Sequence, residues 1–176
     1  MDIARTAQDY ATQAHRSTNH RYDEHHYDFH LGMVAGIAEE FLPQTDFSTE
    51  AYAQIIAGAW CHDIIEDARE TYNDVKKILG EEVAEIVFHL TNEKGRTRAE
   101  RANDKYYAGI KSNDKACFVK CCDRLANMRY SMSKGSKMIE IYRREFPSFK
   151  GKLYTPGKFE AIWMALDAIA LAPQQA

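Results

Sequence analysis

The sequence predicts an all-α fold, a single bundle of about seven or eight helices, from three kinds of observation. Long segments repeat apolar residues at the spacing of an amphipathic helix. Four prolines and nine glycines do not divide the chain as strands and hairpins would require. The 176 residues suit one domain, so residues 1–176 are expected to form one.

Apolar stripes place the predicted helices along the chain. The stripes run over residues 34–41, 52–59, 83–90, 118–128 and 159–169. Pro43 closes the first helix, and Ser48 or Thr49 can cap the second. Loops are expected near residues 18–28, 43–48, 66–71, 92–97 and 147–157. The last helix, with Trp163 and Leu166, is expected to complete the core, and residues 173–176 are expected to fray.

Composition narrows the classes of function. A formal charge of -3 gives no general attraction to nucleic acid or to an anionic membrane. No segment approaches the roughly 18 apolar residues of a membrane span, and no signal peptide is recognisable. We therefore expect a cytoplasmic protein, and the sequence leaves its oligomeric state open. Reduced core thiols are the expected state of the cysteines, which are Cys61, Cys117, Cys121 and Cys122.

The run from His62 to Asp67 places four ionisable groups at the end of an apolar helix. It reads His62-Asp63-Ile64-Ile65-Glu66-Asp67. On a continuing helix His62 and Glu66 share one face, and Asp63 and Asp67 share another. An imidazole and nearby carboxylates suit a divalent metal ion. An exposed acidic helix end is the alternative that this run alone leaves open.

Two further residues strengthen the metal hypothesis. Asp123 lies in a strongly apolar helix, where a carboxylate is costly unless it is paired or bound to metal. An ion pair with Lys120 or Arg124 is the alternative for Asp123. His30 opens the helix that follows a polar, His-rich stretch. The remaining histidines, namely His15, His20, His25, His26 and His89, are predicted to be surface residues or caps.

Together, His30, His62, Asp63 and Asp123 make a set of two imidazoles and two carboxylates. Such a set suits manganese, iron, zinc or another first-row divalent ion. A bound ion lowers the pKa of a water molecule and polarises the group under attack. Glu66 and Asp67 would remain for proton transfer. The residues therefore favour metal-dependent hydrolysis.

The order of these residues resembles the HD hydrolase domain of the RelA/SpoT family, and especially its stand-alone small alarmone hydrolases. The similarity covers roughly residues 11–131. It is carried by Arg21 followed by Tyr27-Asp28-Phe29-His30, by the run from His62 to Asp67, by Leu79-Gly80-Glu81-Glu82-Val83, and by Lys120-Cys121-Cys122-Asp123-Arg124-Leu125-Ala126-Asn127-Met128-Arg129. The His-Asp pair is common to many phosphohydrolases, whereas its combination with the last run is much more specific.

This resemblance implies metal-dependent removal of the 3′-pyrophosphate of ppGpp or pppGpp, which gives pyrophosphate and GDP or GTP. It makes His30, His62, Asp63 and Asp123 the metal ligands, with manganese expected. Glu66 and Asp67 become the catalytic carboxylates. The implied substrate-binding residues are Arg21, Tyr27, Arg124 and Asn127, with Arg21 framing the base and Asn127 beside the sugar or the 5′ phosphates. Basic residues that could neutralise phosphate charge are Lys94, Arg96, Arg98, Arg101 and Arg124.

Departures from the family pattern lie near Arg21 and Tyr27, which the resemblance assigns to substrate binding. Tyr22 follows Arg21 where the family often has Lys, and the turn glycine before Tyr27 is absent. Tyr22 could stack on a base or pack the loop. The alternatives are therefore another HD nucleotide phosphohydrolase, acting on ppApp, on the 2′-phosphate of NADPH or on a nucleoside monophosphate, and a non-catalytic nucleotide-sensing module. A small-molecule nucleotide is the expected partner in each case.

Overall fold

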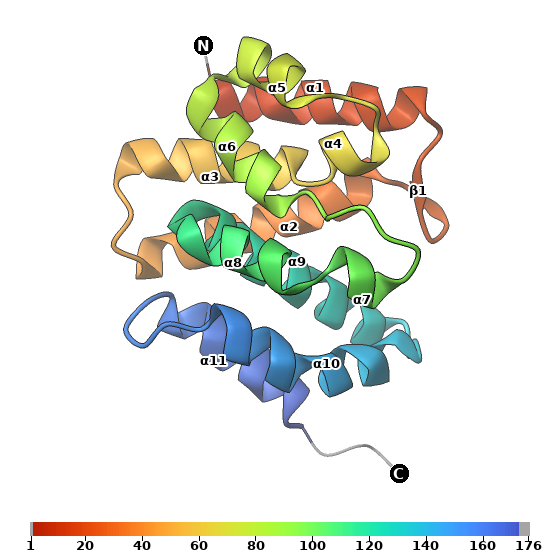
Figure 1. The fold of residues 1–176 in the computed structure, drawn as a ribbon, viewed down its shortest axis with the longest axis vertical. Coiled ribbons are helices and arrows are strands. Elements are labelled where there is room, and N and C mark those ends of the chain that lie inside the picture. The colour runs from red at the N-terminus through yellow and green to blue at the C-terminus, as the bar shows by residue number, and fades with distance from the viewer. Residues whose placement is uncertain (1, 173–176) are drawn as a thin grey trace.

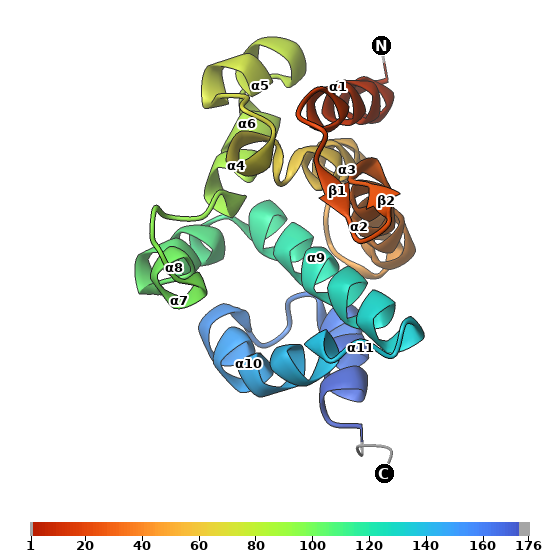
Figure 2. The ribbon, with the colours of Figure 1, turned by 90° about the vertical axis from the view of Figure 1, so that its right-hand side faces the viewer.

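Helix α9 (Asp114–Ser133) runs through the middle of the molecule and contacts helices on several sides (Figure 2). The computed structural model describes residues 2–172. Buried residues such as Phe118, Cys122 and Leu125 lie on nearly all sides of α9, as expected for an interior helix. The helices packed against it are α2 (Asp28–Phe41), α3 (Thr49–Cys61), α6 (Glu81–Leu90), α8 (Asp104–Ser112), α10 (Met138–Leu153) and α11 (Glu160–Ala170).

The N-terminal elements stack above α9 in Figure 1. Helix α1 (Ile3–Ser17) begins at Asp2, whose carboxylate accepts hydrogen bonds from two backbone N–H groups of the first turn. Buried alanines of α1 allow it to pack closely on α3. A short hairpin, β1 (Arg21–Tyr22) and β2 (His25–His26), then leads to α2 and pairs Tyr22 with His25. This hairpin occupies the middle of the loop predicted over residues 18–28.

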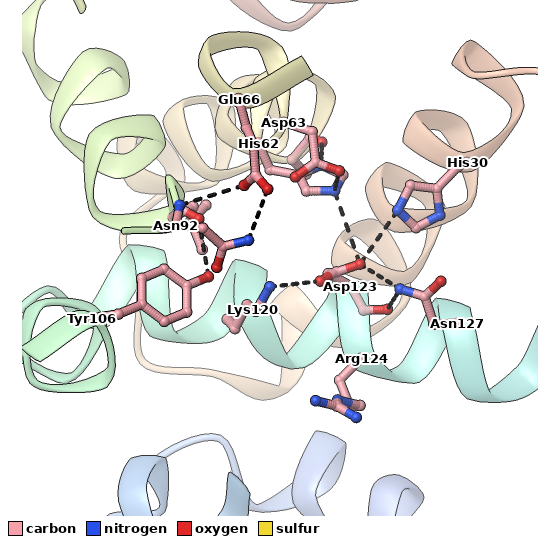
Figure 3. A network of polar contacts seen from close by, with 12 residues as sticks. His30, His62, Asp63, Glu66, Asn92, Tyr106, Lys120, Asp123, Arg124 and Asn127 are labelled. Carbon is pink, nitrogen blue, oxygen red and sulfur yellow. Dashed lines mark hydrogen bonds and ion pairs between the residues drawn. The ribbon is translucent and has the colours of Figure 1, made fainter. Parts of the chain in front are cut away.

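The helix that carries the His-Asp run is interrupted where the run begins. Helix α3 ends at Cys61, and a single turn, α4 (Ile64–Asp67), resumes after His62 and Asp63. The backbone of Asp63 leaves the helical region, with φ −109° and ψ 6°. The chain then enters α5 (Tyr72–Leu79), which begins with a capping box formed by Thr71 and Asp74. The break directs His62 and Asp63 toward α9 (Figure 3).

Eleven α-helical segments and one short 3₁₀ turn (Leu42–Gln44) lie within residues 2–172, more than the predicted seven or eight helices. Two of them, α4 and α7 (Arg98–Arg101), are single turns. Segments of this length cannot show an apolar stripe, so periodicity cannot reveal them. The other nine helices of the described residues are close in number to the predicted seven or eight, so the predicted all-α bundle is confirmed.

The loop predicted over 147–157 is wrong in its first half. Helix α10 continues to Leu153 with Pro147 inside it. Proline lacks an N–H group and usually ends or kinks a helix. Here Phe146, Phe149 and Leu153 are buried, and their packing keeps the last turns of α10 in place.

Two groups of buried apolar side chains form the interior, one around α9 and the other between α1, α3, α5 and α6. Trp163 and Leu166 lie in the first group, as predicted. All four cysteines are buried and unpaired, which agrees with the expected reduced thiols. Within the described residues, no helix is both long and apolar enough to cross a membrane. The frayed end predicted for residues 173–176 lies outside the described residues.

Candidate functional site

Most of the predicted site residues line one cavity of about 810 Å³. Its walls come from α2, α4, α9 and α10 and from the segment around α7 and α8. Neither Arg21 nor His62 is part of the lining. The predicted residues that line the cavity are Tyr27, His30, Asp63, Glu66, Asp67, Asp123, Arg124 and Asn127. Elements far apart in the sequence therefore bring the candidate ligands and carboxylates to one place.

Three of the four predicted metal ligands form a compact group. His30, His62 and Asp123 each offer one ligand atom, and these atoms all lie within 4.8 Å of one another. Asp123 Oδ1 is 3.3 Å from His30 Nε2 and 3.9 Å from His62 Nε2 (Figure 3). Both histidines are buried, with 1% and 2% of their surface exposed. The group therefore sits at the meeting point of α2, the end of α3, and α9.

The hydrogen bonds of His62 show why this group suits a cation. His62 Nδ1 lies 2.8 Å from the carbonyl oxygen of Ala59, which can only accept, so Nδ1 carries a proton. In the neutral imidazole Nε2 then presents a lone pair. That atom is buried without a hydrogen-bond partner and faces the carboxylates of Asp63 and Asp123. A divalent cation between these atoms would satisfy all of them, so the residues fit such an ion.

Asp63, the fourth predicted ligand, adjoins the group without being one of its three members. Its Oδ2 is 3.1 Å from His62 Nε2 and accepts a hydrogen bond from the Tyr27 hydroxyl. Burial opposes protonation of His62, but the carboxylates of Asp63 and Asp123 raise its pKa to about 9, so without an ion Nε2 carries a proton, which a bound cation would replace. Burial, followed by the charge of Asp63, raises the pKa of Tyr27 far above its usual value, so this hydroxyl keeps its proton. Tyr27 therefore acts as a fixed donor to Asp63.

Asp123 has a different neighbour at each oxygen. Oδ2 accepts from Lys120 Nζ at 2.9 Å, while Oδ1 faces the two histidines and accepts from Asn127 Nδ2 at 2.6 Å (Figure 3). The ion pair with Lys120, one of the sequence-based alternatives, is therefore present beside the ligand geometry. Arg124, the other possible partner, contacts Glu145 instead.

Glu66 and Asp67, the predicted catalytic carboxylates, lie on α4 at the cavity wall. Asn92 donates to Glu66 through its side chain at 2.8 Å and its backbone N–H at 3.4 Å, which fixes the carboxylate (Figure 3). Burial and the negative charges of Asp63 and Glu66 raise the pKa of Asp67 to about 6. Perturbed carboxyl groups of this kind cluster at functional sites.

At the hairpin, Tyr22 and not Arg21 reaches the cavity. The Tyr22 ring stacks on His30 with a centroid distance of 4.6 Å, and its hydroxyl donates to Asn127 Oδ1 at 2.8 Å. The Arg21 guanidinium donates to the carbonyl oxygen of Glu24 and lies outside the cavity lining. The Tyr22 ring therefore packs against a candidate ligand, and its stacking on a base stays a prediction.

One histidine was wrongly predicted to be a surface residue or a cap. His15 is fully buried, its ring stacks on Tyr27 at 4.7 Å, and its Nδ1 is 3.0 Å from His20 Nδ1. Burial lowers the pKa of His15 to about 4, although the charge of Asp63 acts in the opposite direction. His20 is half-buried, and its Nε2 is 4.0 Å from Asp67 Oδ2. The pair of histidines therefore forms a layer behind the cavity wall.

Sequence reasoning missed the cavity wall that α10 supplies. Residues of α10 in the lining are Tyr142, Glu145, Ser148, Phe149 and Lys152. Their three- and four-residue spacing marks one face of a helix. The predicted loop over 147–157 cut this pattern in two, so the shared face was not recognised. The mixed polar and aromatic character of that face was the available signal.

Comparison with known proteins gives a local likeness in sequence. No family model matches the chain. It is 31% identical over 75 residues to the guanosine-3′,5′-bis(diphosphate) 3′-pyrophosphohydrolase MESH1 of Drosophila melanogaster. It is 32% identical over 76 residues to the MESH1 protein of Danio rerio. Each alignment covers 43% of this chain and 42% of the relative, so these curated relatives are matched over less than half of their length.

Solved structures show the fold over nearly the whole chain. A structure described as a metazoan orthologue of SpoT that hydrolyses ppGpp matches with a TM-score of 0.76 and 21% identity. The match covers 96% of this chain and 94% of that one. A protein of Listeria monocytogenes matches with a TM-score of 0.59 and 20% identity, over 81% of this chain and 99% of that one. The predicted all-α bundle is therefore confirmed, and its fold is that of the SpoT-like structure.

Proposed function

We propose that this chain is a metal-dependent phosphohydrolase that removes the 3′-pyrophosphate of ppGpp or pppGpp, with residues 1–176 acting as one hydrolase domain. The observation that carries the proposal is the compact group of His30, His62 and Asp123, because His30 and Asp123 line the same cavity as Glu66 and Asp67. The MESH1 relatives and the SpoT-like structure support this choice of reaction.

His30, His62 and Asp123 would hold the divalent ion, with Asp63 as the fourth ligand from the adjoining position. Manganese is the ion we propose, although the same ligands accept other first-row ions. When bound, such an ion makes water more acidic and withdraws charge from a phosphoryl oxygen. Lys120 keeps one oxygen of Asp123 occupied, which leaves the other directed at the histidines.

The carboxylates of α4 would move the protons of the reaction. Water attacks the phosphorus linked to the 3′ oxygen, the P–O3′ bond breaks, and the 3′ oxygen takes up a proton. Glu66 and Asp67 lie on the cavity wall, where a carboxylate can accept the proton of the attacking water and a carboxyl group can return one. The two hydrogen bonds from Asn92 hold Glu66 in place for this role.

The remaining walls suit a nucleotide. The cavity volume of about 810 Å³ lies within the range of small-molecule sites. Tyr27 and Asn127 line it near the ligand group, and Arg98, Arg101 and Arg124 line it elsewhere. Guanidinium groups can hold phosphate oxygens through paired hydrogen bonds. We propose that the sugar lies near Asn127 and that arginines receive phosphate charge.

Product analysis tests the proposal against its alternatives. The protein is stripped of metal, restored with manganese and incubated separately with ppGpp, ppApp, NADPH and nucleoside monophosphates. Pyrophosphate together with GDP from ppGpp is the expected result. Orthophosphate from another substrate would keep the metal-dependent chemistry but replace the substrate. Absence of turnover with all of them, alongside measurable nucleotide binding, would favour the nucleotide-sensing alternative.

A further inference from the structure

A cluster of two arginines and one glutamate lies on the cavity wall that α10 helps to form. Arg98 of α7 contacts Glu145 of α10 through two hydrogen bonds, Nε to Oε1 at 2.8 Å and Nη2 to Oε2 at 3.1 Å. Arg124 of α9 donates from Nη1 to Oε2 of the same carboxylate at 2.9 Å. All three side chains line the cavity, so the cluster faces the space where a substrate would bind.

Arg124 is fixed by its surroundings, whereas 55% of the Arg98 side chain is exposed. Only 7% of the Arg124 side chain is exposed, and its guanidinium lies 5.0 Å from the ring centre of Tyr142 and 4.7 Å from that of Phe149. The Arg98 guanidinium lies 5.8 Å from the Tyr142 ring. Figure 3 shows Arg124 extending from α9 on the side away from His62. The cluster is therefore separate from the candidate metal ligands and belongs to a preformed part of the wall.

The charges of the cluster do not cancel. Two guanidinium groups share one carboxylate, which leaves one positive charge in excess. Burial opposes ionisation of Glu145, but its hydrogen bonds with Arg98 and Arg124 hold its pKa below the usual value, so the carboxylate is charged. Two arginines converging on one anion is also the arrangement that recognises a phosphate group. A phosphate, with more charge and more acceptor oxygens than a carboxylate, can compete for the same donors.

We propose that Glu145 is a specificity-determining residue, because its carboxylate competes with a second phosphate group of the substrate for Arg98 and Arg124. The inference rests on the proposed function, whose substrate carries phosphates on both the 3′ and the 5′ oxygens. With the 3′ end at the candidate metal group, the 5′ phosphates reach the arginines by displacing Glu145. A nucleotide without 5′ phosphates gains nothing from this exchange.

Replacing Glu145 by Gln separates the competing charge from the size of the side chain. With the manganese-restored enzyme, Glu145→Gln is expected to lower the KM for ppGpp about tenfold, because the arginines lose an anionic competitor. The KM for guanosine 3′-diphosphate, which lacks 5′ phosphates, is expected to stay within about twofold. Equal changes in KM for the two substrates, or an unchanged KM for ppGpp, would reject the proposal.

Two further variants distinguish specificity from folding. Glu40→Gln removes a carboxylate that Arg129 also binds through two hydrogen bonds, but outside the cavity lining, so it serves as the matched control and should leave both KM values unchanged. Arg98→Ala should raise the KM for ppGpp and spare that for guanosine 3′-diphosphate. A rise for both substrates would assign Arg98 a structural role and contradict the proposed subsite.

Direct binding keeps this inference distinguishable from the proposed function. The affinities of GDP and guanosine are measured by calorimetry on the wild-type and Glu145→Gln proteins, both restored with manganese. Tighter binding of GDP alone in the variant supports the competition even if no substrate is hydrolysed. Unchanged or weaker GDP binding would overturn it, even if ppGpp proves to be the substrate.

Discussion

At the residue scale, the candidate site depends on which groups contact the two carboxylate oxygens of Asp123. Burial would favour the protonated acid, but Lys120 and the nearby histidines hold the pKa of Asp123 well below its usual value. Lys120 contacts Oδ2 and leaves Oδ1 directed toward His30 and His62. A buried carboxylate is thus kept ionised at the point where the histidines converge. Asp123 and the histidines would therefore bind the ion, and the transfer of protons would fall to other residues, Glu66 and Asp67.

That separation gives a prediction for Asp63 and Glu66. Asp63→Ala is expected to abolish both metal binding and turnover, because it removes the carboxylate that lies 3.1 Å from His62 Nε2. Glu66→Ala is expected to retain the metal and to lose activity by about 10²- to 10⁴-fold, the usual contribution of a general acid or base. Calorimetric titration with manganese measures the first property, and initial rates measure the second.

Glu82→Ala is a suitable control for both variants. Glu82 is exposed on α6, pairs with Lys115 and lies outside the cavity lining, so its loss should change neither property. Normal turnover in purified Asp63→Ala or Glu66→Ala would remove that residue from its proposed role.

At the element scale, the hairpin decides which side chain reaches the cavity. Neighbouring residues of a strand point to opposite faces. In β1 this alternation sends Tyr22 onto His30 and leaves Arg21 against the carbonyl oxygen of Glu24. The family resemblance implies that Arg21 contacts the nucleotide base, whereas the geometry brings Tyr22 and Asn127 to the cavity.

The two residues of β1 can therefore be compared directly. Tyr22→Ala is expected to raise the KM for the hydrolysed nucleotide about tenfold, since it removes both an aromatic face and the contact with Asn127. Tyr22→Phe should have a smaller effect because the ring remains. Arg21→Ala should leave the KM nearly unchanged. Steady-state kinetics measure the KM, and the metal content of each variant is checked. If only Arg21→Ala raises the KM, Arg21 and not Tyr22 contacts the base.

Elements also differ in how far the sequence could predict them. The run from His62 to Asp67 and the isolated Asp123 were recognisable because ionisable groups interrupt apolar stripes. The break between α3 and α4 was not, because one residue with a changed backbone leaves no periodic signal. The α10 wall was missed for another reason: Pro147 indicated a loop, but the burial of Phe146 and Phe149 outweighs the helix-breaking tendency of proline.

At the scale of the whole molecule, the cavity is a product of long-range packing. Its lining draws on α2, α4, α7, α8, α9 and α10, and of these elements α2, α8 and α10 pack directly on α9. No local pattern states which face of α10 will oppose Arg98 and Arg124. The same packing explains the burial of His15, which looked like a surface residue from its polar neighbours at the end of α1.

The burial of His15 makes the stability of the whole molecule depend on pH. Its folded-state pKa of about 4 lies below the ordinary value of 6.5, so between these values the unfolded chain binds more protons than the folded protein. The contribution of His15 to the free energy of unfolding is complete above pH 6.5 and is lost as the pH falls from 6.5 toward 4. A shift of this size corresponds to about 3 kcal/mol of unfolding free energy.

Replacing His15 by Leu should remove this part of the acid sensitivity. Urea unfolding at pH 7.5 and at pH 4.5 gives the loss of unfolding free energy for each protein. The loss should be smaller in His15→Leu than in the wild type by about 2–3 kcal/mol, because Leu cannot take up a proton on unfolding. His89→Gln, which changes a partly exposed histidine on α6, should retain the wild-type loss. Equal losses in all three proteins would show that His15 is not the buried neutral group that its surroundings indicate.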